Sequence, residues 1–436
     1  MPESGAENVT GVDGRHQFIP VQKLDLIEAL ATTGHSGQEQ RDFRTFCAFL
    51  AAYYHHSFYA ELTELKDIHA WFAPHGPKPV RRKPIDLDAA YRDLMATFDN
   101  VMTQAAFVEI PADQVQALGG EHPLLDVKTR TPMDNYESIR IFCRGKTSQT
   151  IERRGALGRK AVATIADVFE DVVVLVRFKR DDGHEKKSRL AWQANGRSAG
   201  PKPGTVLIKY FQNISRPELP MLLPDVRVVM KQKDMLLLGA PALLGGVPIA
   251  LNIIPALSVL LVVAGAYLGY QGSVARDQMT KAIGALSALV GAGAFMFRQY
   301  SNYSNRKLRY QKELADNIYF KNVNNDAGVF ETLIGAAEEQ ETKEALLAFH
   351  FLLTEGPFKD ADTLDTRIEE WLHQTFGITV DFEVSDALSK LEQLGLLTHE
   401  SGKIGTVSLT EALIRLDTLW DQLYDFKRPA QTHAAA

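Results

Sequence analysis

The feature that most constrains this chain of 436 residues is a stretch without any charged side chain, from residue 235 to residue 275. The apolar part of this stretch ends at Tyr270, and a second apolar run follows over residues 282–297. A bilayer core needs roughly 20 consecutive apolar residues per helical span. We therefore expect a membrane hairpin, with transmembrane helices over residues 247–270 and 282–297 and a short loop over 271–281.

The lengths of the two runs refine this expectation. The first run is too long for one helix and is interrupted by Pro241, Pro248 and Pro255. Residues 215–246 are therefore expected to form an amphipathic entry segment at the membrane interface. The second run would measure about 24 Å as a helix, against a bilayer core of about 30 Å. The alternative is a pair of helices buried inside a soluble protein.

Basic residues gather on the two outer flanks of these runs and predict the topology. The bridge between the runs holds only Arg276 and Lys281, offset by Asp277. By the positive-inside tendency, both soluble parts lie on one cytoplasmic side. The N-terminus resembles neither a secretory signal nor a mitochondrial presequence, which favours a bacterial inner membrane over the alternative of a mitochondrial membrane. The flanking basic residues are Arg227, Lys231, Lys233, Arg298, Arg306, Lys307 and Arg309.

Small residues recur at helical spacing within the two expected spans. Gly265 and Gly269 lie four apart in the first span, and Ser287 and Gly291 lie four apart in the second. Such spacing lets helix backbones approach closely, either within the hairpin or between copies of the chain. Neither span holds an ionisable residue. Ion-coupled transporters usually carry such groups in the membrane, so this class is disfavoured.

Helical signals dominate residues 15–105. Ser36 opens a capping box, and apolar residues then recur every three or four positions as far as Leu65. Asp86 is a candidate N-cap for a further helix that ends near Gln104. We expect these helices to form the first part of an N-terminal domain.

The period changes to that of strands over residues 106–214. Alternation is clear at 139–143, Gly145 indicates a turn, and residues 147–153 are expected to return as the partner strand. The β-branched run at 171–179 predicts a central strand, and a further strand follows. The expected fold is an α+β membrane protein, whose N-terminal domain combines helices with an antiparallel sheet of four or more strands.

The C-terminal part is expected to be rich in helices. Residues 298–355 predict juxtamembrane helices, and residues 356–428 show the order of a winged-helix module, with two helices, a two-stranded wing and a last helix. The ends of the chain, 1–14 and 429–436, are expected to be disordered. The second helix of the module opposes contact with phosphates because acidic residues outnumber its one lysine, Lys390. These acidic residues are Glu383, Asp386 and Glu392.

Charge and composition exclude several other functions. Residues 331–436 carry a net charge of −12 and the rest of the chain carries +6, so nucleic acid is not an expected partner. Cys47 and Cys143 are too few for a disulfide framework or a zinc site and are read as reduced core residues. The histidines at 55 and 56 lack a second pair of ligands, and no glycine-rich loop has phosphate-binding spacing. We therefore expect no metal, no cofactor and no catalytic residues.

Two long segments carry a family resemblance: GTVLIKYFQNISRPELPMLLPDVRVVMKQKDMLLLGAPALLGG and NRKLRYQKELADNIYFKNVNNDAGVFETLIGAAEEQETKEALLAFHFLL. They resemble the domain-of-unknown-function 3754 family, whose animal members are known as the transmembrane protein 143 family. The resemblance covers residues 204–426 and, more weakly, the N-terminal helices. It implies a two-span integral membrane protein of bacteria, plants and animal mitochondria, and it implies no established activity.

These observations together predict a membrane-anchored scaffold or regulatory protein. Its partners would be the lipid bilayer and other proteins or further copies of itself. One alternative is an oligomeric channel or permeation accessory formed by the hairpin. Another is a membrane-surface enzyme with a site between the soluble domains, for which the plainer interpretation of the candidate residues is a helix end and a turn. These candidates are Asn305, Arg306, Asn324, Asn325 and Asp326.

Overall fold

The computed structural model divides the chain into two compact units. The first unit comprises residues 1–117, 133–219 and 321–436, and the second comprises 118–132 and 220–320. The N-terminal and C-terminal soluble parts thus fall within one unit, and the long uncharged stretch lies in an insertion. The structure describes residues 15–75, 79–80, 86–117, 128–130, 133–153, 162–180, 203–229, 257–258, 261, 263–265, 268, 276–400 and 402–423.

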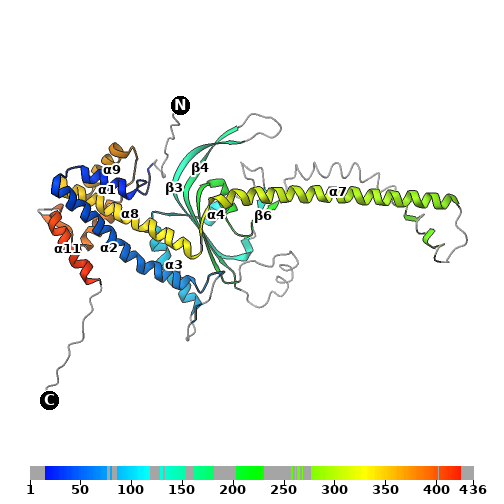
Figure 1. Cartoon of the computed structure of the whole chain (residues 1–436), viewed down its shortest axis with the longest axis horizontal. Helices are drawn as coiled ribbons and strands as arrows, with labels where there is room; N and C mark the ends of the chain where they lie inside the picture. The colour runs from blue at the N-terminus through cyan, green and yellow to red at the C-terminus, as the bar shows by residue number, and fades with distance from the viewer. Residues whose placement is uncertain are drawn as a thin grey trace, which may run out of the picture. The chain divides into compact units, whose positions relative to one another are not determined.

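Helices α1, α2, α3, α8, α9 and α11 of the first unit gather on one side of its long strands (Figure 1). The structure places an apolar face on α2 where the sequence predicts one, and Phe43, Phe46 and Leu50 on this face are fully buried. The helices are α1 (Lys23–Thr32), α2 (Gly37–His69), α3 (Leu87–Gln104), α4 (Ala112–Ala117), α8 (Ala327–Thr354), α9 (Ala361–Phe376), α10 (Val384–Gln393) and α11 (Leu409–Gln422).

The two expected helix caps have different outcomes. Asp86 caps α3 as predicted, because its side chain accepts hydrogen bonds from the backbone of Asp88 and Ala89. Ser36 precedes α2, but among the described residues its side chain makes no capping hydrogen bond. The predicted capping hydrogen bond is therefore wrong, although α2 does begin directly after Ser36, at Gly37.

A five-stranded antiparallel sheet confirms the α+β class. The strand order is β1-β3-β4-β5-β7, so the β-branched run lies in the central strand as predicted. The last strand, β7, was expected only as a turn between helices, since three asparagines around a single valine give no strand signal. The strands are β1 (Val108–Ile110), β3 (Tyr136–Arg153), β4 (Val162–Phe178), β5 (Val206–Ser215) and β7 (Asn322–Asn325).

The turn predicted at Gly145 is wrong. β3 continues through this residue, and residues 147–153 pair with β4 rather than with 139–143. Gly145 has a φ of +68°, and a Cβ added there would lie 2.7 Å from the side chain of Glu170. The glycine therefore marks a close approach between neighbouring strands, which is the second meaning of an isolated glycine in a strand pattern.

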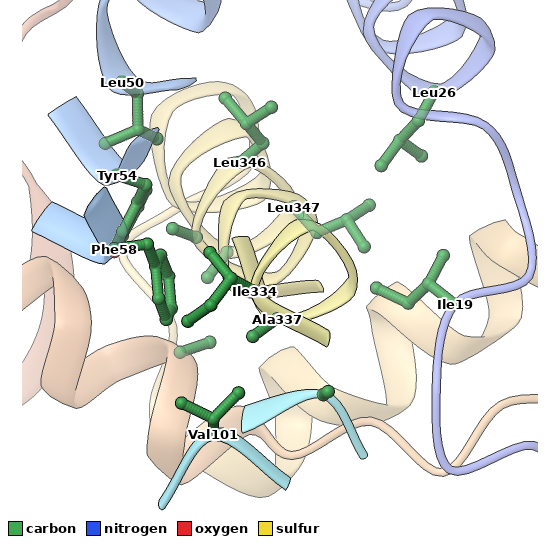
Figure 2. Packing of buried hydrophobic residues seen from close by; sticks show 14 of the residues in the cluster. Ile19, Leu26, Leu50, Tyr54, Phe58, Val101, Ile334, Ala337, Leu346 and Leu347 are labelled. Carbon is green, nitrogen blue, oxygen red and sulfur yellow. The ribbon is translucent and has the colours of Figure 1, made fainter. Parts of the chain in front are cut away.

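Helix α8 is the centre of the hydrophobic core. It packs against α2, α3, α9 and α10 and also contacts β5 and β7 of the sheet. The ring of Phe330 on α8 meets Phe98 of α3, which in turn meets Phe142 of β3. Figure 2 shows side chains of α8 between those of α2 and those of the N-terminal segment: Ile334, Ala337, Leu346 and Leu347, with Leu50, Tyr54 and Phe58 opposite Ile19 and Leu26.

Both faces of the sheet are buried, which explains the uninterrupted apolar sequence of β4. Val173 and Leu175 belong to the core that contains the helices. Val172, Val174 and Phe211 alternate with them and are also almost completely buried. A strand buried on both faces loses the polar-apolar alternation that would otherwise mark it.

The C-terminal elements follow the expected order of helix, helix, two-stranded hairpin and helix. The hairpin consists of β8 (Leu397–Glu400) and β9 (Lys403–Thr406). These elements are joined to the N-terminal segment, because His16 exchanges backbone hydrogen bonds with Thr379 and Asp381. The C-terminal elements therefore share contacts with the rest of the first unit.

In the second unit, a two-stranded sheet pairs β2 (Lys128–Arg130) with β6 (Arg227–Val229), and α7 (Arg276–Lys321) forms one helix of 46 residues. This helix begins within the loop expected at 271–281 and continues past 298 without a break. The described part of the chain contains one stretch long and apolar enough to cross a membrane, Met279–Asn302. Most of the span predicted at 247–270 lies outside the described residues, so the hairpin is not confirmed. The expected disordered ends also lie outside them.

Candidate functional site

The apolar half of α7 exposes its side chains rather than burying them. Only 18% of the most apolar window within Met279–Asn302 is buried, whereas a core helix would be mostly buried. Among the side chains described on this part of the helix, those of Ala282, Ala285 and Ala292 are buried. The exposed apolar residues are Met279, Ile283, Leu286, Val290, Met296, Phe297 and Tyr300.

The predicted packing residues are not at a close contact in the described part of the chain. A Cβ added at Gly265 or Gly291 would meet no described atom within 4 Å. The Ser287 hydroxyl donates to the carbonyl of Ile283 on its own helix, at 2.9 Å. Gly269 lies outside the described residues. A role for these residues in helix packing stays a prediction.

The predicted flanking basic residues fall at three places. Arg227 begins β6, and Lys231 and Lys233 lie outside the described residues. The others lie along α7 after its apolar part: Arg298, Arg306, Lys307 and Arg309.

The end of α7 is joined to the sheet without a loop, since β7 begins at the next residue. The Nζ atom of Lys321, the last residue of α7, lies 2.9 and 2.8 Å from the two carboxylate oxygens of Glu218. Glu218 is buried in the turn after β5 and also accepts a hydrogen bond from the backbone N–H of Ser215. The ion pair and the pairing of β7 with β5 therefore hold the C-terminal end of α7 in place.

The polar residues after Lys321 bond mainly to one another and to the backbone. Asn324 donates to the hydroxyl of Thr332, and Asn322 donates to the side-chain oxygen of Asn325. The backbone N–H of Asp326 donates to the carbonyl of Ile208 at 2.8 Å, just before α8. These contacts build a strand end and a helix start.

The structure does not bring the five candidate polar residues together. Asn305 lies on α7 about 24 Å along the helix axis from its last residue, Lys321, and its amide is 3.5 Å from the hydroxyl of Ser301. Arg306 follows it on the same helix. Asn324, Asn325 and Asp326 lie beyond the end of α7. The described residues therefore do not show an arrangement of these side chains that could form the candidate membrane-surface enzyme site.

A second polar site, which the sequence did not indicate, is buried between α8 and α10. The Nζ atom of Lys390 lies 2.9 Å from Glu341 and 2.7 Å from Asp386, and it also bonds to Glu344. The side chains of Lys390, Glu341 and Glu344 are only 7%, 7% and 9% exposed. Three carboxyl groups thus share one ammonium group in the protein interior.

Further hydrogen bonds connect this site to the N-terminal segment. Gln340 donates to the second oxygen of Glu344 at 2.6 Å and accepts from the backbone N–H of Ile19. Lys343 donates to the carbonyl of Ile19 and pairs with Glu339. The polar stretch of α8 therefore satisfies the backbone of a neighbouring segment inside the core, as buried polar groups require.

Burial and charge shift the pKa values at this site in opposite directions. Burial raises the pKa of Glu341 to about 7, although Lys390 acts to lower it. Burial also raises the pKa of Glu344. Burial alone would lower the pKa of Lys390, but Glu344 and Glu341 outweigh it and raise that pKa, so the ammonium stays charged.

The three carboxyl groups are close enough to one another to ligate a cation. The ammonium group of Lys390 already bonds to each of them and supplies the positive charge. We therefore assign no metal to this site. The signal in the sequence was the run EEQETKE next to an apolar segment, but a charged run in a helix usually indicates a solvated face.

The two cysteines are free and buried. Burial raises the pKa of the Cys47 thiol to about 12 and raises the pKa of the Cys143 thiol as well. Because the thiolate is the reactive form, neither residue is suited to nucleophilic chemistry.

Comparison with known proteins gives a family and no function. No solved structure matches the chain. Residues 169–328 match the family model described as Protein of unknown function (DUF3754). The matched segment begins earlier than the predicted resemblance and ends at the start of α8. It contains most of β4, the strands β5 and β7, and the whole of α7. Over this segment the chain is similar to the DUF3754 family.

Proposed function

We propose that this protein is a membrane-anchored scaffold or regulatory protein, in which the apolar half of α7 crosses the bilayer. The single observation that carries the proposal is the exposure of the apolar residues of this helix. Ile283, Leu286 and Val290 leave more than half of their surface in contact with solvent. An exposed apolar surface of this size indicates a membrane or a binding surface, and the length of the stretch Met279–Asn302 matches a bilayer core.

Helix α7 continues without a break beyond its apolar stretch. Residues 303–321 extend the helix by about 28 Å beyond the apolar stretch and carry charged residues, which suits an aqueous environment. The helix then joins β7 directly, with Lys321 bonded to Glu218. One continuous helix, rather than a loop, thus connects the apolar stretch with β7 along the chain.

The first span of the hairpin, at residues 247–270, belongs to the same proposal. With two spans, both ends of the chain lie on one side of the membrane, and the basic residues that flank the runs place them in the cytoplasm of a bacterium. The likeness to the transmembrane protein 143 family, and with it the mitochondrial alternative, stays a prediction.

The proposed partners are proteins rather than nucleic acids. Lys390 is the one basic residue of α10, and its ammonium group is turned inward onto three carboxyl groups. The exposed residues of α10 include Glu392, so the helix offers phosphates a negative surface. No described contact favours the channel or the enzyme, and we propose neither.

The anchor is tested by fractionation of cells that express the full chain. We expect the protein in the membrane fraction after alkaline carbonate washing. Replacing both Leu286→Arg and Val290→Arg should move most of it to the soluble or aggregated fraction, since each Arg costs about 3 kcal/mol at the centre of a span. The matched control is Leu308→Arg on the aqueous half of α7, which should stay in the membrane. Recovery of the native chain in the wash would contradict the proposal.

The hairpin is tested by labelling introduced cysteines in intact cells. Gly272→Cys should react from the side opposite to both Gln38→Cys and Ser389→Cys, because it lies between the two expected spans and the other two residues lie outside them. The native cysteines are buried and give little background. Reaction of Gly272→Cys from the same side as Gln38→Cys would exclude the hairpin, since a first span would then not separate them.

A further inference from the structure

The buried charges between α8 and α10 are unequal in number. Glu341 and Glu344 of α8 and Asp386 of α10 face the single ammonium group of Lys390. With all three carboxyl groups ionised, the site holds two uncompensated negative charges, and Glu341 and Glu344 are both within the core. Uncompensated charge in the protein interior is costly and is usually removed by binding a proton.

The hydrogen bonds identify which carboxyl group takes the proton. Both oxygens of Glu344 accept hydrogen bonds, one from Lys390 and one from Gln340, so its ionised form is stabilised. Glu341 accepts from Lys390 through one oxygen, and no described donor bonds to its other oxygen. Asp386 is half-exposed and retains contact with solvent. The proton therefore belongs on Glu341.

We propose that Glu341 is the proton-binding group of a latch between α8 and α10, which holds α10 on α8 when Glu341 is protonated and loosens it when Glu341 ionises. The latch goes beyond the proposed membrane anchor and does not depend on it. It would make the position of α10, and of the β8–β9 hairpin that follows, responsive to pH.

The groups that face Glu341 come from each of the helices around it. Lys390 and Asp386 face it from α10, and Glu344 from its own helix. The phenol of Tyr54 faces the same cluster from α2, and burial raises the pKa of this phenol, so it stays neutral. The basic group of α1, Lys23, pairs with Glu338, and that of α9, Arg367, pairs with Glu355.

The pKa of Glu341 gives the direction of the response. Burial raises this pKa to about 7, above that of a glutamate in an unpacked chain. The packed state therefore holds a proton that the loosened state has lost, and packing is most favourable in acid. Its stability falls as the pH rises from about 4.5 through about 7 and then levels off.

Hydrogen exchange of the purified full chain tests the latch. Protection factors, corrected for the intrinsic pH dependence of exchange, should fall about tenfold in α10 between pH 6 and pH 8. The amides of α2 should change much less, because the latch is a local opening. Glu341→Gln mimics the protonated form and should keep α10 protected at both pH values.

The matched control is Glu392→Gln, which neutralises an exposed carboxylate one residue before the end of α10. It should retain the native pH dependence. Constant protection of α10 from pH 5 to pH 8 in the native chain would overturn the proposal, and so would an unchanged pH dependence in Glu341→Gln. Equal loss of protection in α2 and α10 would show global unfolding and would also overturn it.

Discussion

Two long helices, α7 and α8, lie next to each other in the chain and have opposite relations to their surroundings. In α7 the apolar residues are exposed, as at Leu286 and Val290. In α8 even the charged residues are buried, as at Lys343 and Glu344. The strand β7 and one residue, Asp326, are all that separates them. The polarity of a helix alone therefore does not determine where the helix lies; the surfaces available to cover it also decide.

The difference follows from the neighbours of each helix. Helix α8 is surrounded by α2, α3, α9 and α10 and by the edge of the sheet, so that most of its residues are covered. Its polar residues are tolerated there because each finds a partner, such as Ile19 for Lys343. The apolar half of α7 has few such neighbours among the described residues, and a bilayer would provide the missing cover.

The largest expected effect comes from removing the cation of the buried charge cluster between α8 and α10. Lys390→Met removes the ammonium group and leaves three carboxyl groups without a cation. We expect a loss of about 3–5 kcal/mol in the free energy of unfolding, because Glu341 and Glu344 stay buried and lose their cation. Denaturant unfolding of the purified chain measures this, with Lys403→Met on the exposed hairpin as the control. A loss no greater than that of the control would mean that the cluster is unimportant for stability.

The second prediction compares one leucine on each helix. Leu346 of α8 is fully buried and Leu286 of α7 is 55% exposed. Leu346→Ala should cost about 2–5 kcal/mol through lost burial and the cavity it leaves. Leu286→Ala should change the unfolding free energy of the first unit by no more than about 0.5 kcal/mol. Similar losses in both variants would show that α7 is packed against protein.

The sequence predicted the elements whose signals are local. The cap at Asp86 and the end near Gln104 located α3, and the β-branched run located the central strand. Those signals depend on residues close together in the chain. The sequence also indicated the apolar part of α7, though not that the helix continues to Lys321.

The features that the sequence missed depend on contacts between distant residues. Glu341 and Lys390 are separated by 49 positions and meet only because α10 packs on α8. The four residues of β7 become a strand because β5 presents a free edge to them. Gly145 had two meanings, a turn or a close approach, and only the position of Glu170 decides between them. The sequence also did not indicate that α7 continues from Asn305 as far as Lys321, before Asn324.

A smaller effect is expected where α7 meets the sheet. Lys321→Ala removes the cation that pairs with the buried Glu218, which should cost about 1–3 kcal/mol. Hydrogen exchange should show faster opening of β7 and of the last turn of α7, with little change in α2. Lys312→Ala, at an exposed position of the same helix, is the control. Unchanged exchange in β7 would show that strand pairing alone holds this junction.

The smallest expected effects come from replacing one glycine in each of the two helices. A Cβ added at Gly335 of α8 or at Gly291 of α7 would meet no described atom within 4 Å. Gly335→Ala should therefore stabilise the chain by about 0.5–1 kcal/mol through helix propensity alone.

A substitution at Gly291 also tests helix packing, because this residue belongs to the small-residue pattern of the expected span. If Gly291 faces lipid, Gly291→Leu should leave the amount of membrane-inserted protein unchanged. We expect this result, since no described helix lies against the position. Less carbonate-resistant protein, or the loss of a crosslinked dimer formed by the native chain, would instead show that a second helix packs there. That outcome would remove the contrast between α7 and α8, because both helices would then be covered by protein.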